Sequence, residues 1–338
     1  MKSKRDVTIY DVAKVLNISA STVSRGLNDH PHLRKETVLK IKTTADEMGY
    51  QPNKFASNLR LRKTNTLGLV VPKLNSYFMA AVISGIEKIT NENGYGLIIS
   101  TSNESESREI SSVNTLFKSR VDGLMVSVAY DTVSPQHFDI FLKKNIPVVF
   151  FDRVFKHAGC VSIVIDNVSA GYEATMHLVE QGCKRIAHIG GNMQRDVYSG
   201  RFEGYKKALN DSGIMFDKNL VSVGDMSQEA GFESAKKFLK MKNRPDGVFA
   251  ANDTVAVALI MYLLDADIRV PEDICVVGFN NEPLSTIIKP NLSTVDYPAC
   301  QIGETAATSL INKLNNKHTE NIIIEHKLIV RDSSLRKK

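Results

Sequence analysis

The amino-acid sequence predicts an α/β protein with a small helical head at the N-terminus and a larger body of doubly wound parallel sheets in two subdomains. Apolar residues recur at helical spacing through the first 48 residues, and from Thr66 onward short β-branched runs alternate with amphipathic stretches. Residues 1–63 hold 13 Lys and Arg against 6 Asp and Glu, whereas the whole chain of 338 residues has a net charge of only +6. The positive excess therefore lies in the head, which favours a polyanion as the partner of the head and another task for the body.

Three helices are predicted in the head. The first follows Thr8 as N-cap and has i, i+3, i+4, i+7 spacing of apolar residues, namely Ile9, Val12, Ala13 and Leu16. Ser19 is placed to cap a second helix over residues 20–27, with Val23 and Leu27 facing inward. A third helix is expected over residues 35–48, and Gly49 is placed to end it.

Two short helices with a tight turn between them and a third that closes the core form a helix-turn-helix unit. In that unit the second helix enters the major groove of DNA, and its outward side chains near the N-terminus reach base edges. Those side chains here are Ala20, Ser21, Ser24 and Arg25. Any three-helix bundle has this periodicity, so the pattern alone leaves DNA binding open. The local positive charge favours DNA binding, because phosphate neutralisation supplies much of the affinity.

A basic segment follows the head. Asn53 after Pro52 can cap a helix of about two turns, which is marginal in isolation and needs a partner. With DNA as that partner, Leu59 would be an apolar wedge in the minor groove. Phosphates would then be contacted by Lys54, Arg60, Arg62 and Lys63. A solvated basic linker explains the same residues equally well.

The body shows the alternation of strands and helices that indicates parallel sheets covered by helices. Strands are expected at residues 67–71, 96–100, 123–128, 147–151, 185–189, 247–250 and 274–278. Amphipathic helices are expected at residues 80–93, 168–181, 201–212, 230–241 and 255–265. So many elements fit two doubly wound subdomains better than one sheet.

Enzyme motifs of such folds are missing from the sequence. No G-x-G-x-x-G opens a helix after a strand, and the stretch from Gly190 to Met193 lacks the third glycine and the downstream acid. A Walker loop and a nucleophile elbow are absent as well. We therefore expect no enzyme and no cofactor, although a lone acid or base pair would leave no motif.

The cysteines and the apolar stretches point to a cytoplasmic protein without metal. Cys160, Cys183, Cys275 and Cys300 form no CxxC pair and have no His at ligand spacing, so reduced thiols are expected. The N-terminus lacks the apolar core of a secretory signal. No stretch approaches the ~20 apolar residues of a membrane helix.

The runs VTIYDVAKVLNISASTVSRGLN and GYQPNKFASNLRLRKTNTLGLVVP resemble the head, hinge helix and first core strand of the LacI/GalR family of bacterial transcription regulators. The resemblance implies base reading by Ala20, Ser21 and Arg25. It implies contacts to the DNA backbone by Tyr10, Ser19, Thr22, Ser24, Asn28, His32 and Asn53. It also implies a minor-groove wedge at Leu59 flanked by Ala56, with the hinge helices of a dimer paired inside the groove.

The body resembles the periplasmic-binding-protein-like core of the same family. The resemblance rests on IDNVSAGYEATMHLVEQGCKRIAHIGG, GRFEGYKKAL, FAANDTVAVALIMYL, IRVPEDICVVGFNNEP, PNLSTVDYP and IVRDSSL. It implies three crossings between subdomains, near Ile165, Ser293 and Ile324, and a small molecule bound between them. The implied effector contacts are Tyr77, Phe78, Asp152, Arg201, Met226, Asn252, Asn280 and Tyr297.

The chemistry of these side chains suits a polyhydroxylated ligand, because aromatic faces stack on a ring and amide, carboxylate and guanidinium groups bind hydroxyls. Each also has a structural explanation: Phe78 as core, Arg201 in an ion pair at a helix N-terminus, and Asn252 as the cap of a helix beginning near Thr254. Members of the family often carry Asp where this chain has Asn280. A ligand with a carboxylate or phosphate therefore stays open beside a sugar.

The sequence as a whole predicts a ligand-controlled transcription regulator, a repressor that binds a pseudo-palindromic operator as a homodimer. The expected domains are residues 1–51 for DNA binding, 52–64 for the hinge and 65–338 for the core. Within the core, one subdomain is expected at residues 65–164 and 294–324, and the other at 165–293 and 325–338. A tetramer is not expected, because no heptad tail of leucines follows Ser334. The alternative is a sugar receptor without operator binding.

Overall fold

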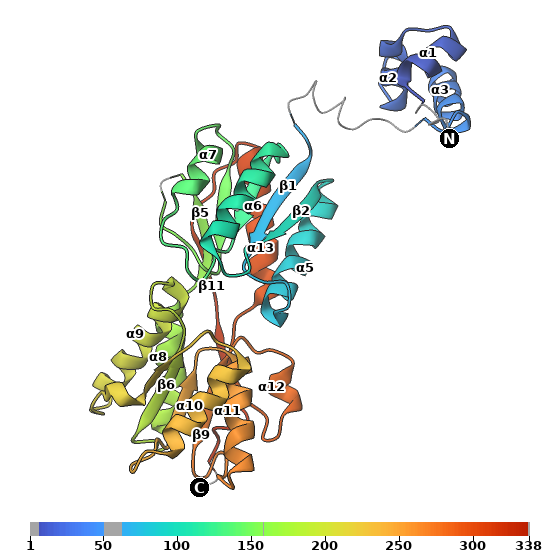
Figure 1. The fold of residues 1–338 in the computed structure, drawn as a ribbon. Coiled ribbons are helices and arrows are strands. Elements are labelled where there is room, and N and C mark those ends of the chain that lie inside the picture. Colours follow the sequence, from blue (N-terminus) through green and yellow to red (C-terminus); the bar gives the residue numbers. More distant parts are fainter. Residues whose placement is uncertain (1–6, 51–62, 158, 337–338) are drawn as a thin grey trace, which may run out of the picture. The chain divides into compact units, whose positions relative to one another are not determined.

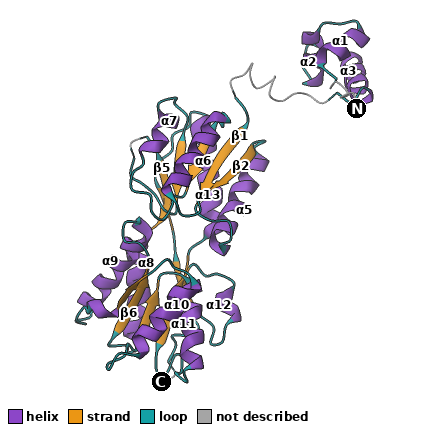
Figure 2. Cartoon of the chain, viewed as in Figure 1, coloured by secondary structure: helices purple, strands orange, loops and turns teal. Residues whose placement is uncertain are grey.

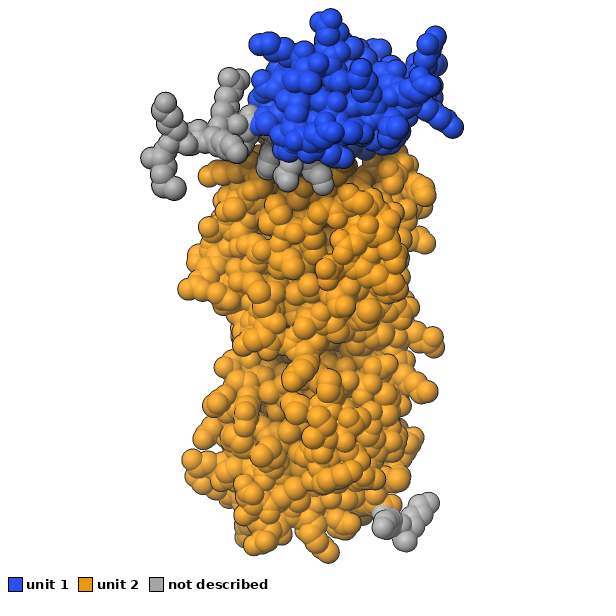
Figure 3. Space-filling view, turned by 90° about the vertical axis from the view of Figure 1, so that its right-hand side faces the viewer, with its two compact units in different colours: residues 1–64 blue, residues 65–338 orange. Residues whose placement is uncertain are grey.

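The computed structural model describes residues 7–50, 63–157 and 159–336. The chain divides into two compact units, residues 1–64 and residues 65–338, which Figure 3 draws in different colours. We call them the head and the body. In the described ranges no helix is long and apolar enough to cross a membrane.

The described part of the head forms the helices α1 (Ile9–Leu16), α2 (Ala20–Leu27) and α3 (Lys35–Glu47), as predicted (Figure 1). Thr8 and Asp11 form a capping box at the start of α1, in which the Asp11 carboxylate accepts the Thr8 N–H at 2.8 Å. Ser19 caps α2 by accepting the Thr22 N–H at 3.1 Å. Because each cap is local in sequence, both helices begin at the residues that the sequence indicates.

The head has a small apolar core in which the three helices meet. Its buried members are Val12, Ala13, Val23, Ile41 and Ala45, and Leu27 is partly buried against them. Gly26 is buried where α2 approaches α3, and a Cβ at this position would collide with the side chain of Ile41. The core fixes which side of α2 faces outward.

The first sheet of the body is parallel, with strand order β11-β5-β4-β3-β1-β2. Its strands are β1 (Thr66–Val71), β2 (Gly96–Thr101), β3 (Gly123–Val126), β4 (Val148–Phe151), β5 (Val161–Ile165) and β11 (Ile322–Ile324). Helices α5 (Tyr77–Glu92) and α13 (Ala299–Leu314) pack on one face. The other face carries α6 (Glu106–Lys118), the short 3-10 turn η1 (Gln136–Phe138) and α7 (Asp139–Leu142). Alternate strand residues serve the two faces.

The second sheet has strand order β12-β10-β9-β8-β6-β7 and is parallel except for β12, which pairs antiparallel with β10. Its strands are β6 (Ile186–Gly190), β7 (Val221–Val223), β8 (Gly247–Ala250), β9 (Cys275–Phe279), β10 (Ser293–Asp296) and β12 (Lys327–Ile329). One face is covered by α8 (Asn167–Glu180) and α9 (Asp196–Asp211). On the other lie α10 (Gln228–Leu239) and α11 (Asp253–Asp265), with the short α12 (Leu284–Ile287) beside α11. The 3-10 turn η2 (Lys218–Leu220) leads into β7.

The chain passes between the two sheets three times within the described body (Figure 2). The first crossing follows β5, and the last joins β11 to β12. The second lies between β10 and α13, because β10 still pairs with β9 while α13 packs against α5 and β4. The expected crossing near Ser293 is therefore a few residues too early, and residues 294–296 belong to the second sheet.

Helix α9 begins at Asp196, five residues before the position expected from the sequence. Its first turn carries Val197 and Tyr198, which are buried, but no side chain caps the helix, so the sequence has no start signal there. Strands β7, β11 and β12 have three residues each, too few to show a period.

Candidate functional site

One face of α2 carries the side chains predicted to read DNA bases. Ser21 and Arg25 are exposed there, whereas Val23 and Gly26 on the opposite side are buried in the head core. Ser24 is half-buried beside them, whereas Ala20, also predicted to read bases, is half-buried and packs against the head core. The face is thus small and polar, with one guanidinium.

The predicted backbone-contact residues surround this face. Tyr10 on α1 is 74% exposed, and Ser19 at the N-terminus of α2 contacts the hydroxyls of Ser21 and Thr22 at 2.8 Å. Asn28 donates to the Ser24 carbonyl oxygen at 2.8 Å, and His32 is exposed beyond the end of α2. The predicted contacts Asn53, Lys54, Ala56 and Leu59 lie outside the described residues.

In the body, the predicted effector residues follow the carboxyl ends of strands in both sheets. Tyr77 and Phe78 come after β1, Asp152 after β4, Met226 after β7, Asn252 after β8, Asn280 after β9 and Tyr297 after β10. Arg201 lies on α9. In open α/β sheets ligands bind outside these strand ends. We call the region where the strand ends of the two sheets meet the junction.

Three of these residues, Asp152, Tyr297 and Phe78, are linked by contacts at the junction. Asp152 accepts hydrogen bonds from Tyr297 Oη at 3.3 Å and from Ser127 Oγ at 3.0 Å. The rings of Phe78 and Tyr297 lie 4.6 Å apart. Since Asp152 belongs to the first sheet and Tyr297 follows a strand of the second, this cluster joins the two subdomains.

Arg201 is a buried cation held in a fixed orientation. Its Nε donates to Asn167 Oδ1 at 2.9 Å and its Nη1 to the Ala251 carbonyl oxygen at 2.7 Å. The guanidinium carbon lies 3.6 Å from the centroid of the Phe279 ring, a cation–π contact. These partners show that Arg201 does not form the helix-terminal ion pair considered as its alternative. Burial raises the pKa of the Asp152 carboxyl, and the charges of Arg153 and Arg201 oppose that rise.

Asn252 has two roles. Its Oδ1 accepts the Val255 N–H at 2.8 Å and so caps α11, while its Nδ2 donates to the Met226 carbonyl oxygen at 3.0 Å. The helix-capping alternative is thus realised, and the amide also holds Met226 in place. Phe78 likewise belongs to the buried core and contacts Tyr297. Tyr77 is 60% exposed and is not part of the cluster around Asp152.

Three of the predicted effector positions have left-handed backbone conformations, with φ of 58° at Asp152, 64° at Met226 and 107° at Asn280. Asn and Asp adopt positive φ more readily than other non-glycine residues, so Met226 is the unusual one of the three. The loop after Asn280 is held by the buried carboxylate of Asp253. This carboxylate accepts hydrogen bonds from the Glu282 N–H at 2.7 Å and from the Thr294 hydroxyl at 2.6 Å. Burial raises the pKa of Asp253 to about 8.

A second set of contacts spans the junction and was not predicted. Tyr130 Oη donates to the Gly224 carbonyl oxygen at 2.7 Å, and the Val154 N–H donates to Asp196 Oδ1 at 3.2 Å. Arg195 donates to the Thr132 carbonyl oxygen. We call these the cross-junction contacts. They come from loops after β3 and β4 on one side and from α9 and the loop after β7 on the other, and no local pattern marks them.

The charged groups at or beside these contacts are shielded from solvent: Arg195 is buried, and Asp196 and Arg153 are half-buried. Burial raises the pKa of Asp196 to about 6, and hydrogen bonds from Val154 and Val197 oppose the rise. Arg153 forms an ion pair with Glu104 at 2.7 Å. Arg195 is 3% exposed, and its Nε has no hydrogen-bond partner among the described residues. An acceptor atom of a ligand would satisfy this donor.

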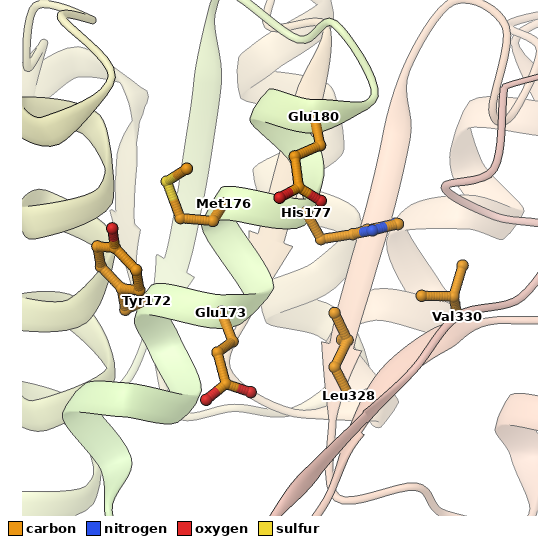
Figure 4. A pocket seen from close by; sticks show the side chains of 7 residues that line it. All are labelled: Tyr172, Glu173, Met176, His177, Glu180, Leu328 and Val330. Atoms are coloured by element: carbon orange, nitrogen blue, oxygen red, sulfur yellow. The ribbon is translucent and has the colours of Figure 1, made fainter.

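A surface cavity of about 550 Å³ lies elsewhere on the body (Figure 4). It is lined by Tyr172, Glu173, Met176, His177, Glu180, Leu328 and Val330. These residues come from α8 and the β12 region, and none is a predicted effector residue. We place the candidate effector site at the junction instead, because polar groups from several strand ends converge there. The described residues contain no group of three or more His, Cys, Asp or Glu side chains that could hold a metal ion.

Family models match residues in both the head and the body. Residues 8–53 match the model of the bacterial regulatory proteins of the lacI family, and residues 175–334 match the periplasmic binding protein-like domain. Catabolite control protein A of Priestia megaterium is 30% identical over 332 residues, covering 97% of this chain and 99% of that protein. The transcriptional repressor PurR of Vibrio atlanticus is 31% identical over 330 residues, covering 97% and 98%.

Solved structures are similar over nearly the whole chain. A complex of the transcriptional regulator CelR with cellobiose has a TM-score of 0.74 at 29% identity, covering 97% of this chain and 99% of that one. The lac repressor dimer bound to operator and the anti-inducer ONPF has a TM-score of 0.88 at 24% identity, covering 98% and 100%, and supports the fold.

Head and body together define a helix-turn-helix regulator of transcription with a periplasmic-binding-protein-like core. The chain belongs to the LacI family of bacterial regulatory proteins. The predicted fold class, family and regulatory function are confirmed.

Proposed function

We propose that this chain is a repressor that binds a pseudo-palindromic operator as a homodimer and responds to a sugar or sugar derivative at the junction. The observation that carries the proposal is the convergence of Asp152 and Tyr297, which follow strands of the two sheets, with Arg201 of α9. Related regulators have structures with bound cellobiose and bound ribose. The unpaired Nε of buried Arg195 is a further donor for a ligand with acceptor atoms.

We propose the following site residues for the two regions. DNA contacts are assigned to Tyr10, Ser19, Ala20, Ser21, Thr22, Ser24, Arg25, Asn28, His32, Asn53, Lys54, Ala56 and Leu59. Effector contacts are assigned to Tyr77, Phe78, Asp152, Arg201, Met226, Asn252, Asn280 and Tyr297. The supporting observations are the exposure of the α2 face and the placement of the body residues at strand ends.

The coupling follows from how the chain connects its parts. The hinge, residues 52–64, leads directly into β1 of the first subdomain. A ligand that binds one relative orientation of the two subdomains better than another shifts the population toward that orientation. In a dimer, this shift changes the separation of the two hinges and hence their ability to pair in the minor groove. The cross-junction contacts are the interactions within the protein that contribute to this equilibrium between subdomain orientations.

Exposed apolar side chains support the homodimer. Strand β2 lies at the edge of the first sheet and exposes Ile98 and Ile99, 40% and 41% accessible. In the second subdomain, Met261 and Leu264 on α11 and Ile287 on α12 are exposed as well. Edge strands and apolar patches of this kind are usually covered by a partner. A two-fold symmetric dimer would cover both sets on each copy.

We infer a cytoplasmic protein without enzymatic activity, with residues 1–51 as the DNA-binding domain and 65–338 as the core. The absence of phosphate-binding and nucleophile motifs from the sequence supports the inference that the protein has no enzymatic activity. The cytoplasmic location is inferred because a transcription regulator needs access to chromosomal DNA. Within the core, β10 and the packing of α13 support a first subdomain of about residues 65–164 and 297–324.

The proposal is tested by selecting duplexes from a random DNA pool with the full chain and measuring binding by gel shift at low salt. We expect an enriched pseudo-palindrome bound by two chains. A chain that retards no duplex, with or without sugars, would instead be a receptor without operator binding. Turnover of a bound sugar that Asp152→Ala abolishes would identify an enzyme.

A further inference from the structure

Two buried thiols of the second subdomain have no part in either candidate site. Cys183 lies between α8 and β6, and Cys275 is the first residue of β9; their exposed fractions are 2% and 0%. Both residues lie beside β8, since the Cys183 side chain extends toward Gly247 and Cys275 is the register partner of Gly247 on the neighbouring strand. The two residues are thus far apart in sequence and adjacent in space.

A glycine makes this contact possible. Gly247 at the start of β8 is the register partner of Cys275 on the neighbouring parallel strand. A Cβ at Gly247 would lie 3.0 Å from Cys183 Sγ and 3.1 Å from Cys183 Cβ. The missing side chain therefore leaves the space into which the Cys183 thiol extends beside Cys275.

A partly exposed cation lies against the thiol pair. Cys183 Sγ donates to the Asp246 carbonyl oxygen at 3.2 Å, and Cys275 Sγ donates to that of Pro271 at 3.4 Å. The guanidinium of Arg336 donates to the same two oxygens, from Nη2 to Asp246 at 3.1 Å and from Nε to Pro271 at 3.2 Å. One guanidinium thus bridges the two carbonyls that the thiols contact.

The two thiols differ in acidity. The pKa of Cys275 is lowered by the neighbouring Cys183 thiol and by the charge of Arg336; burial and the charges of Asp246 and Glu272 act in the opposite direction. The pKa of Cys183 is raised by the neighbouring Cys275 thiol and by burial. Because the thiolate is the reactive form, Cys275 is the nucleophile of the pair.

We propose that Cys183 and Cys275 form an oxidisable dithiol site that a peroxide converts into an intrachain disulfide. The Cys275 sulfur attacks one peroxide oxygen, the O–O bond breaks, and hydrogen peroxide leaves one water and a sulfenic acid on Cys275. The Cys183 sulfur then attacks the Cys275 sulfur, the S–O bond breaks, and a second water leaves with the Cys183 proton. Two thiols are oxidised by two electrons and one peroxide is reduced to two waters. The inference is independent of the proposed function.

The direct test uses the full chain with Cys160→Ser and Cys300→Ser, so that only this pair remains. The native protein is treated with hydrogen peroxide, and intact mass, thiol content and peptide maps are measured. We expect both thiols to disappear together, the mass to fall by two hydrogen atoms, and a reductant to restore both thiols. The proposal is overturned if the pair stays reduced under exposure that oxidises the exposed Cys300 of the unsubstituted chain. Mass gain by oxygen without a crosslink would overturn it too.

Two further variants in the same background assign the roles. Cys183→Ser should trap a sulfenic acid on Cys275 that dimedone labels, and labelling of neither sulfur would contradict the nucleophile assignment. Arg336→Ala should move the pH midpoint of the oxidation rate upward by removing the positive charge beside Cys275. Arg244→Ala, an exposed arginine of the same subdomain, is the matched control and should leave the midpoint unchanged. Equal midpoints in all three proteins would remove Arg336 from the site.

Discussion

The head and the body differ in how their candidate binding residues are presented to a ligand. In the head, a core of a few apolar residues fixes one helix, and the candidate contacts such as Ser21 and Arg25 are exposed. In the body, Asp152 and Arg201 are buried, and their partners come from segments far apart in sequence. A polyanion can bind exposed side chains because it supplies the opposing charge, whereas a small neutral ligand needs donors and acceptors held in place before it arrives.

Arg201→Lys should have the largest effect and should confine it to the body. A lysine ammonium cannot replace the planar fork that donates to Asn167 and the Ala251 carbonyl oxygen and lies on Phe279. We expect the substitution to weaken sugar binding by about 3 kcal/mol, roughly 100-fold in Kd. The sugar used is the first one found to raise the melting temperature of the unsubstituted chain. Calorimetry measures it. Arg185→Lys, in a surface ion pair with Asp217, is the control and should bind normally.

The half-buried carboxyl of Asp196 should make the stability of the body depend on pH. Its pKa in the folded chain is about 6, above the ordinary value of 3.8, so the folded state holds a proton that the unfolded state releases. Stability from this group is therefore fully present below about pH 4 and is lost as the pH rises through about 6.

Asp196→Asn should remove that loss while keeping an oxygen acceptor for the Val154 N–H. Relative to the unsubstituted chain, the variant should gain about 3 kcal/mol of unfolding free energy between pH 4 and 7, since one pKa unit corresponds to about 1.4 kcal/mol. Urea unfolding followed by tyrosine fluorescence measures it. Parallel stability–pH curves for the two proteins would contradict the assignment.

Closely packed glycines in the body and in the head allow each unit to be destabilised separately. Gly204 on α9 packs so closely on α8 that a Cβ would collide with the Val168 carbonyl oxygen and lie 2.5 Å from the Tyr172 nitrogen. Gly204→Ala should cost the body about 2–3 kcal/mol in urea unfolding, because backbone atoms must move apart. Gly96→Ala, whose Cβ would meet nothing closer than 3.8 Å, is the control. Gly26→Ala should instead destabilise only the head. A single urea-unfolding transition shared by the head and the body would contradict the prediction that the two units unfold independently.

Arg25→Ala should have the smallest effect and should confine it to the head. Its side chain is exposed, so we expect unchanged thermal stability and a loss of about 1–3 kcal/mol of discrimination at one base pair. Binding to duplexes with single substitutions in the selected site measures the discrimination. An unchanged site preference with uniformly weaker binding would assign Arg25 to a phosphate.

The same contrast explains what the sequence predicts well. The starts of α1 and α2 follow from Thr8 and Ser19, because a cap acts on residues two or three positions away. The parallel sheets follow from the alternation of strands and helices. The effector positions were predicted only through the family resemblance, and the structure places all of them except Arg201 after the ends of strands.

The features that the sequence did not predict depend on partners that are far away along the chain. Strand β10 belongs to the second sheet through its pairing with β9, which nothing in the residues 293–296 announces. The cross-junction contacts use backbone groups of Val154 and Gly224, which carry no sequence signal. Asp196 and Arg195 are polar residues whose burial is decided by loops of the other subdomain.

The central claim is that a ligand bound in the body controls DNA binding by the head. Its most direct test is the Kd of the full chain for its selected duplex, measured by fluorescence anisotropy with and without a saturating sugar found by thermal shift. At a sugar concentration that saturates the unsubstituted chain but lies well below the Kd of Arg201→Lys, the account predicts a change of about 5- to 150-fold in the unsubstituted chain, the usual range of allosteric coupling, and none in Arg201→Lys. An identical Kd with and without the bound sugar in the unsubstituted chain would contradict the claim.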